Sequence, residues 1–294
     1  MRLEILIPYY GRFDYLREAV ESILAQTDSN WELTVVDDGY PSTEAADYFS
    51  QLADPRIEYL RNDSNLGITA NFNRCLKLAK REHFVLMGFD DRLRPAFIAE
   101  ANKLVAVFPD AAIYQLGVEV IDATGEVYQP LPDKIKSILR PKQSEPKALT
   151  GGGALASLML GNWLYFPSLI WKSAKIKQHV FDSRFEIVQD LDLISKILIE
   201  GGEMALSDNV CFQYRRHAAS ESSKAGGNAK RYQEERVLFS ELKLALRSRG
   251  LNKAALRAEL RITSRLAALV EAGKLVISGK ILHVAPLMKI AFGR

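Results

Sequence analysis

LTVVDD at residues 33–38 and FVLMGFDD at residues 84–91 are apolar runs that each end in two adjacent aspartates. Short apolar runs of this length are typical of buried strands. Adjacent carboxylates repel each other and burial disfavours their charged form, so such pairs cost stability unless a cation or polar ligand compensates them. Two pairs at the trailing ends of two strands therefore predict one ligand site at one edge of one sheet.

Strand-like and helix-like segments alternate around these two runs. Strands are expected at residues 3–7, 33–36, 57–60 and 84–89, and helices at residues 14–26, 43–52 and 69–79. This alternation predicts parallel βαβ units with right-handed crossovers, and hence an α/β fold with a mainly parallel sheet flanked by helices. Ligands of such sheets bind beyond the carboxyl ends of the strands, where both aspartate pairs and the turn at 8–12 fall.

The pattern loosens after residue 92. Helices are expected at 96–108 and 190–200, and a strand is expected at 112–120. Residues 129–150 are rich in Pro and Lys, which predicts an exposed loop. From residue 230 onward the apolar residues follow a helical spacing, which predicts amphipathic helices.

The chain has 294 residues, of which 48% are hydrophobic and 26% are charged. These values are typical of a globular protein. Cys75 and Cys211 lie in apolar or periodic segments, so both are expected to be reduced packing residues of a cytoplasmic protein. We expect no signal peptide, because the first residues lead straight into a strand, and no run approaches the ~20 apolar residues that span a bilayer.

Charge is unevenly distributed between the two parts of the chain. Residues 230–294 carry 14 Lys and Arg against 5 Asp and Glu, whereas the whole chain has a net charge of only +3. An acidic body with a basic amphipathic tail suggests a body that binds a cation and a tail that meets an anionic surface. A solvated helical face, packing on the body and packing on another subunit are the alternatives for the tail.

Six local motifs occur in a characteristic order. They are ILIPYYGR at 5–12, VVDDG at 35–39, NLGITANFNR at 65–74, GFDD at 88–91, VQDLDL at 188–193 and FQYRRH at 212–217. In this order, residues 3–220 resemble family 2 glycosyltransferases with the GT-A fold. The resemblance implies a catalytic domain over 1–229, with a nucleotide-binding part at about 1–91 and an acceptor part at about 92–229, followed by the tail at 230–294.

The resemblance also implies which residues bind the nucleotide-sugar: Pro8, Tyr9, Tyr10, Arg12, Asp37, Asp38, Asn65, Gly67, Asn71 and Asp90. An aromatic side chain of the first turn would stack on the base, and Arg12 would approach the diphosphate. Asp38 is preferred over Asp37 as the acceptor for the ring N–H of the base. Gly67 would let the backbone approach the nucleotide at the start of a helix.

A divalent metal, Mn²⁺ or Mg²⁺, is the cofactor that the resemblance implies, with Asp90, Asp91 and His217 as its ligands. Gly88 stands where the family commonly has a further Asp. Asp190 is the expected catalytic base, and Gln189 precedes it where the family has Glu. The alternative for Asp190 is a helix cap, and the alternative for His217 is a structural role.

The implied function is inverting transfer of a sugar from a nucleoside-diphosphate sugar, with UDP or dTDP favoured, to a saccharide or lipid-linked hydroxyl acceptor. Trp163 and Tyr165 are candidates for stacking on the acceptor sugar, or else they are core aromatics. Synthesis of cell-surface polysaccharide or glycolipid is the expected context, with the tail at the inner face of the membrane. No nucleic-acid partner is expected. The formation of a homo-oligomer is left undecided by the sequence.

Three other functions are alternatives to this one. A nonenzymatic nucleotide-sugar binder fits the departures at Gly88 and Gln189. A sugar nucleotidylyltransferase ranks lower, because its first loop should be Gly-rich whereas residues 8–12 contain one Gly. A dehydrogenase is disfavoured, because the first turn lacks a three-glycine phosphate loop.

Overall fold

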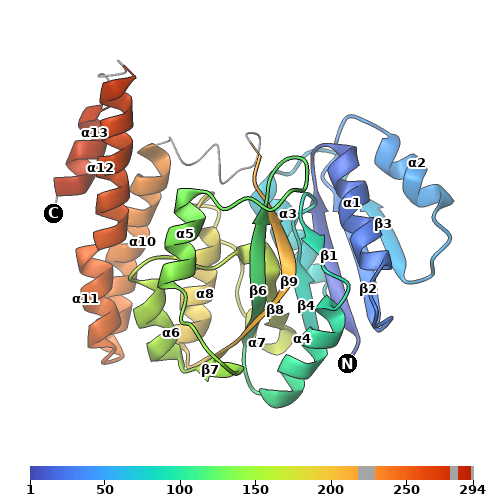
Figure 1. Ribbon diagram of the computed structural model, residues 1–294, viewed down its shortest axis with the longest axis horizontal. Helices are drawn as coiled ribbons and strands as arrows, with labels where there is room; N and C mark the ends of the chain where they lie inside the picture. Colours follow the sequence, from blue (N-terminus) through green and yellow to red (C-terminus); the bar gives the residue numbers. More distant parts are fainter. Residues whose placement is uncertain (218–228, 279–283, 293–294) are drawn as a thin grey trace.

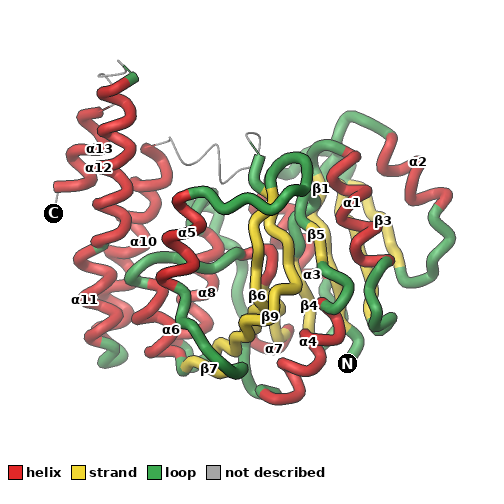
Figure 2. Tube along the Cα trace, viewed as in Figure 1, coloured by secondary structure: helices red, strands yellow, loops and turns green. Residues whose placement is uncertain are grey.

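The computed structural model describes residues 1–217, 229–278 and 284–292, and these residues form a central sheet flanked by helices on both faces (Figures 1 and 2). The strands are β1 (Leu3–Tyr9), β2 (Trp31–Asp37), β3 (Ile57–Arg61), β4 (His83–Leu86), β5 (Arg92–Leu93), β6 (Ile113–Ile121), β7 (Lys147–Leu149), β8 (Leu169–Lys172) and β9 (Met204–Arg215). Their order across the sheet is β3-β2-β1-β4-β8-β6-β9-β5, and β7 also pairs with β9.

The helices of the body are α1 (Phe13–Leu24), α2 (Glu44–Gln51), α3 (Ile68–Leu78), α4 (Phe97–Val107), α5 (Leu131–Leu139), α6 (Gly151–Leu158), α7 (Ser173–Ile176) and α8 (Gln189–Ile199), with a 3₁₀ turn at Phe166–Ser168. The C-terminal helices are α10 (Ala229–Ser248), α11 (Asn252–Leu260), α12 (Ile262–Ile277) and α13 (Val284–Phe292).

The four strands expected from the N-terminal alternation pair in parallel, as predicted. β1 lies between β2 and β4, and β2 also pairs with β3. The first strand continues through Pro8 to Tyr9, two residues beyond its expected end. Because these strands run in the same direction, their carboxyl ends meet at one edge of the sheet, and both aspartate pairs lie there.

β8 interrupts the parallel arrangement. It pairs antiparallel with both β4 and β6, which places the C-terminal half of the sheet beside the N-terminal half. β6 and β9 then pair in parallel. The ends of β6 and β9 therefore reach the same edge of the sheet as the end of β4, and the later motif at 212–217 arrives beside Asp90.

Both faces of the sheet are buried. Leu6 belongs to the core on one face, and its neighbours Ile5 and Ile7 belong to the core on the other face. Helices α3, α6, α8, α10 and α11 contribute to the first core, and α1, α2 and α4 contribute to the second. Burial of both faces explains why β1, β2 and β4 are mainly apolar, whereas the edge strand β3 carries the exposed Glu58 and Arg61. Cys75 and Cys211 are buried free cysteines within these cores.

Helix α5 corrects the prediction of an exposed loop over residues 129–150. Pro132 lies in the first turn of α5, where its missing N–H costs no hydrogen bond. Leu139 packs against the first core, and Asp133 is buried. The high Pro and Lys content concealed this short helix.

The C-terminal helices lie at one end of the molecule (Figure 1). Leu238, Leu242 and Leu246 of α10 share a core with α6 and α8, so this part of the tail packs on the body. Tyr232 also joins α12 and α13 in a smaller apolar cluster. None of the helices in the described part of the chain is long and apolar enough to cross a bilayer. The remaining tail residues, 279–283 and 293–294, lie outside the described residues.

Candidate active site

Asp38 directly follows β2 and is buried under the loop that precedes α3. Its carboxylate accepts hydrogen bonds from Asn62 Nδ2 at 2.6 Å and from the backbone N–H groups of Leu66 and Gly67 at 2.9 and 3.0 Å. These donors compensate the buried negative charge. Asp38 thus ties the end of β2 to the 65–67 loop, a role that the base-contact prediction did not include.

The loop at 65–67 is shaped by two further predicted residues. Gly67 has a φ of 85°, in the region that favours glycine, and its N–H also donates to Asn65 Oδ1 at 2.8 Å. Asn71 is buried in α3 and donates from Nδ2 to the Val36 carbonyl at 3.0 Å. The Asn-x-Gly motif therefore fixes the loop against β2 and leaves the start of α3 at the ligand edge.

Asp37 is the last residue of β2 and is fully buried. Its Oδ1 accepts the Tyr40 N–H at 2.8 Å, and its Oδ2 accepts the Tyr59 hydroxyl and an Arg61 guanidinium N–H, the latter at 3.4 Å. These contacts within the protein give Asp37 a structural role.

The two tyrosines of the first turn have different surroundings. Tyr9 is buried among the core residues and donates its hydroxyl to the Gly11 carbonyl at 2.7 Å. Tyr10 is 46% exposed, and its ring meets the Tyr40 ring edge-on at 5.2 Å. Of the two, Tyr10 has the free ring surface that stacking on a base requires.

Arg12 lies just after this turn, at the N-cap of α1. Its guanidinium forms an ion pair with Asp14, and this interaction lowers the pKa of the Asp14 carboxyl. The side chain is largely exposed and also lies over the Tyr15 ring at 4.6 Å. Pro8, half-buried within β1, pairs with β2 and holds the turn at the sheet edge.

Asp90 and Asp91 follow β4, and β9 brings His217 to them. His217 Nε2 lies 2.8 Å from Asp90 Oδ2. Asp91 Oδ1 accepts the Arg215 N–H at 2.9 Å, and Arg215 Nε donates to the Asp90 carbonyl at 2.7 Å. Arg215 was not predicted as a site residue, although it lies within the 212–217 motif. Its buried guanidinium anchors the turn that carries both aspartates.

Asp91 is the least compensated carboxylate of the two pairs. Its Oδ2 is buried and has no hydrogen-bond partner among the described residues. Burial and the neighbouring Asp90 raise the pKa of Asp91 well above its usual range. A Cβ at Gly88 would lie 2.6 Å from this oxygen, so glycine leaves the space in front of the aspartates open.

The donor set at this turn suits a hard divalent cation. Two carboxylates and one imidazole are suitable ligands, and the unpartnered Asp91 Oδ2 is an atom that a cation would compensate. Within residues 1–217, 229–278 and 284–292, no three acidic, Cys or His side chains are already gathered as a metal cluster. Asp90 contacts His217, whereas Asp91 accepts a hydrogen bond from the backbone N–H of Arg215.

Asp190 lies in the first turn of α8, preceded by the buried Gln189. Burial raises the pKa of Asp190, and the Leu191 N–H and the charges of Lys136 and Arg231 oppose that rise. Its Oδ1 accepts the Leu191 N–H at 2.7 Å. A carboxylate with a raised pKa is a better proton acceptor than an ordinary one, so the surroundings of Asp190 suit a general base.

A charged cluster next to Asp190 was missed at the sequence level. The buried Asp133 accepts from Arg216 at 2.5 and 2.9 Å and from the Tyr165 hydroxyl at 2.8 Å. Lys136 donates to the Leu164 carbonyl at 2.6 Å, and burial lowers its pKa to about 8. The signal for this cluster was the helical spacing of the apolar residues in α5.

The two aromatics proposed for the acceptor differ in accessibility. Trp163 is completely buried and donates from Nε1 to Ser157 Oγ at 3.1 Å, which favours the core alternative. Tyr165 is 9% exposed and has its hydroxyl engaged by Asp133. Both side chains nevertheless line the cavity described below.

Sequence comparison places the chain in a family. The profile described as "Glycosyl transferase family 2" matches residues 4–172. The putative colanic acid biosynthesis glycosyl transferase WcaA of Escherichia coli (strain K12) is 30% identical over 209 residues, which cover 68% of this chain and 67% of WcaA. The chain therefore belongs to glycosyltransferase family 2, as the resemblance of the motifs indicated.

Structural comparison agrees at the level of the fold. S. aureus TarS 1–349 in complex with UDP-GlcNAc matches 99% of this chain and 90% of its own, with a TM-score of 0.66 and 13% identity. The mannosyltransferase PcManGT from Pyrobaculum calidifontis, in complex with GDP-Man and Mn²⁺, matches 99% and 86%, with a TM-score of 0.62 and 14% identity. These likenesses confirm the expected GT-A fold.

Proposed function

We propose that this glycosyltransferase moves a sugar from a nucleoside-diphosphate sugar to a hydroxyl acceptor with inversion at the anomeric carbon. Two observations carry the proposal: the half-buried Asp190 has a raised pKa, and the acidic turn at Asp90 and Asp91 is under-compensated. The first supplies a base, and the second supplies a site for the diphosphate end of a donor. The donors bound by TarS and PcManGT, UDP-GlcNAc and GDP-Man, support this donor class.

A single displacement needs only one base from the protein. The acceptor oxygen would attack the anomeric carbon while Asp190 takes its proton, and the bond to the nucleoside diphosphate would break on the opposite face. Arg12 would lie near the leaving diphosphate, and Tyr10 would stack on the base. No covalent glycosyl-enzyme intermediate is required, so a second nucleophilic carboxylate has no part in this mechanism.

Asp90, Asp91 and His217 would hold the divalent cation. When bound, Mn²⁺ or Mg²⁺ stabilises the negative charge that develops on a departing diphosphate. Arg215 would keep both aspartates in place, because it binds the Asp90 carbonyl and the Asp91 carboxylate from behind.

The test is a screen of UDP-, dTDP- and GDP-sugars for metal-dependent hydrolysis, measured as nucleotide release. We expect hydrolysis of at least one donor, its loss in chelator and its return with Mn²⁺ or Mg²⁺. Undiminished hydrolysis in chelator would contradict the metal role. Calorimetric binding of a donor that is never hydrolysed or transferred would instead support the nonenzymatic binder, which the departures at Gly88 and Gln189 favour.

WcaA is named for colanic acid biosynthesis, which supports a role in polysaccharide biosynthesis. We further propose that the product is cell-surface polysaccharide or glycolipid and that synthesis takes place at the inner face of the membrane. Part of α12 supports a peripheral contact: Ile262, Leu266 and Val270 are spaced by four residues, and each is about half exposed. Co-sedimentation with vesicles rich in anionic lipid should be weakened by replacing these three residues with Ser. Unchanged sedimentation would leave the tail as a packing element or a subunit contact.

A further inference from the structure

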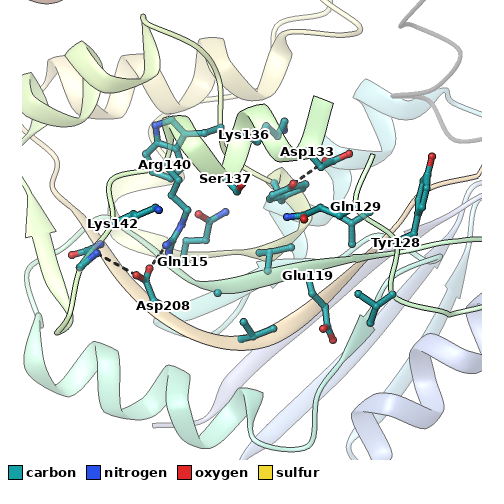
Figure 3. A pocket seen from close by; sticks show the side chains of 18 of the residues that line it. Gln115, Glu119, Tyr128, Gln129, Asp133, Lys136, Ser137, Arg140, Lys142 and Asp208 are labelled. Atoms are coloured by element: carbon teal, nitrogen blue, oxygen red, sulfur yellow. Dashed lines mark hydrogen bonds and ion pairs between the residues drawn. The ribbon is translucent and has the colours of Figure 1, made fainter. Parts of the chain in front are cut away.

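A cavity of about 690 Å³ lies between α5 and the strands β6 and β9 (Figure 3). Its volume is that of a small-molecule site. Lys136 and Ser137 come from α5, Arg140 follows it, and Gln115 comes from β6 (Figure 3). Asp90, Asp91 and Asp190 are absent from its described lining, so this cavity is distinct from the proposed donor site.

Polar groups without partners line this cavity. Gln115 is completely buried, and its Oε1 has no hydrogen-bond partner in the described part of the chain, although its Nε2 donates to Ser168 Oγ at 3.0 Å. Both amide atoms of the Gln143 side chain are likewise buried and unpartnered within the described ranges. Buried polar atoms are normally satisfied, so these donors and acceptors indicate a polar occupant.

The lining also provides apolar ring surface. Tyr128 is 49% exposed at one end, and the buried Tyr165 is also a lining residue. Amide groups beside aromatic rings match the alternating hydroxyl and C–H faces of a sugar. Arg140 and Asp208 form an ion pair within the cavity wall. Their charges compensate each other, so they do not favour a charged ligand.

The cavity is connected to the proposed base. Lys136 lines it, and the Lys136 ammonium also lowers the pKa of Asp190. Asp133, another lining residue, is bound by Arg216, which precedes His217 in the chain. A ligand here would therefore lie beside the groups that surround the reacting hydroxyl.

We propose that this cavity is the acceptor site and that it binds a saccharide through Gln115, Gln143 and the Tyr165 ring. The inference rests on the proposed transferase function and adds the substrate class of the acceptor. In this proposal, the Tyr165 ring contacts the sugar from the cavity wall. Trp163 packs in the core and supports that wall.

The experiment blocks the cavity and measures saccharide binding. Ser144 is exposed and lines the cavity, and the natural cysteines are buried, so Ser144→Cys can be labelled selectively with a bulky maleimide. Saturation-transfer NMR with methyl glycosides of glucose, galactose, mannose, fucose, N-acetylglucosamine and glucuronic acid should detect at least one ligand. We expect labelling to reduce that signal at least about tenfold.

Ser50→Cys on α2, labelled in the same way, is the matched control, because Ser50 is exposed at the other end of the sheet (Figure 1). Gln143→Leu should weaken the same glycoside about tenfold through the loss of its hydrogen bonds, whereas Gln178→Leu on the surface should not. The proposal would be overturned if no glycoside gave a saturation-transfer signal, or if labelling of Ser144→Cys left that signal unchanged.

Donor binding separates this inference from the proposed function. Calorimetry with UDP-, dTDP- and GDP-sugars and Mn²⁺ should give the same affinity before and after labelling of Ser144→Cys. Loss of donor binding on labelling would assign the cavity to the donor and overturn the acceptor proposal. Failure of the unlabelled chain to bind any nucleotide-sugar would instead count against the transferase function itself.

Discussion

The aspartates at the end of β2 and those after β4 share a sequence pattern but have opposite surroundings. Asp38 accepts hydrogen bonds from three donors within 3.0 Å. Asp91 is equally buried, yet one of its oxygens has no partner among the described residues, and a like charge lies beside it. The first region uses its carboxylates to hold the fold, whereas the second leaves one carboxylate oxygen without a partner among the described residues, as the proposed metal role requires. Hydrogen-bond satisfaction distinguishes the two roles where the motif alone does not.

Asp190 is the proposed base, and its replacement should have the largest effect. Asp190→Asn removes the base but retains an oxygen that can accept the Leu191 N–H, so the fold should persist. We expect transfer to fall by about 10²–10⁴-fold while donor affinity stays within twofold of the parent. Initial rates of transfer and calorimetric donor binding measure the two quantities.

Asp192→Asn is the control for Asp190→Asn. Asp192 lies on the same helix, also has its pKa raised by burial, and pairs with Lys196 at 2.6 Å. Its replacement should leave transfer within about threefold of the parent, since its charge is already used within the helix. If the two variants transfer at equal rates, the assignment of Asp190 as the base is wrong.

In the first region, the predicted effect is on stability. Asp38→Asn places an amide N–H among groups that are themselves donors, and leaves at least one of them unsatisfied. We expect the free energy of unfolding to fall by about 3 kcal/mol, measured by urea denaturation without nucleotide. An unchanged free energy of unfolding would show that the hydrogen bonds of Asp38 do not stabilise the fold.

The parallel half of the sheet could be predicted because β1, β2 and β4 are mainly apolar runs and amphipathic helices follow β1, β2 and β3. The sequence placed the aspartates at the correct edge for the same reason. It could not predict β8, since a four-residue antiparallel strand between β4 and β6 is specified by long-range packing rather than by local pattern.

The candidate site was predicted unevenly. His217 does reach Asp90, a contact across 127 positions of the sequence that only the motif order suggested. Tyr9 was assigned to the nucleotide, but the extension of β1 buries its ring. Asp133 and Lys136 were missed because Pro and Lys masked the helical spacing of α5. Local composition misleads where a short helix owes its stability to packing.

Asp91→Asn tests the second region on stability and on metal binding. In chelator, we expect the free energy of unfolding to stay constant or to rise by about 1 kcal/mol, because an uncompensated buried charge is removed. The new amide oxygen can still accept the Arg215 N–H. Titration with Mn²⁺ should show affinity reduced at least about tenfold. A destabilisation as large as that of Asp38→Asn would show that both regions are structural.

The smallest effect concerns the pH profile of transfer. Burial raises the pKa of Asp190, and only the ionised carboxylate accepts a proton, so kcat should fall as pH decreases through that raised value. Lys136→Met removes a positive charge that lowers this pKa, and the acid limb should therefore move to higher pH. Because the pKa of Lys136 itself is lowered to about 8, the two profiles should converge above that pH.

The matched control for Lys136→Met is Lys134→Met, which removes an exposed charge from the same helix. Its acid limb should coincide with that of the parent. The comparison uses kcat at saturating acceptor, since Lys136 also lines the cavity and its loss can weaken acceptor binding without altering the base. Equal shifts in the two variants would mean that the surface charge of α5, rather than the buried ammonium, sets the ionisation of Asp190.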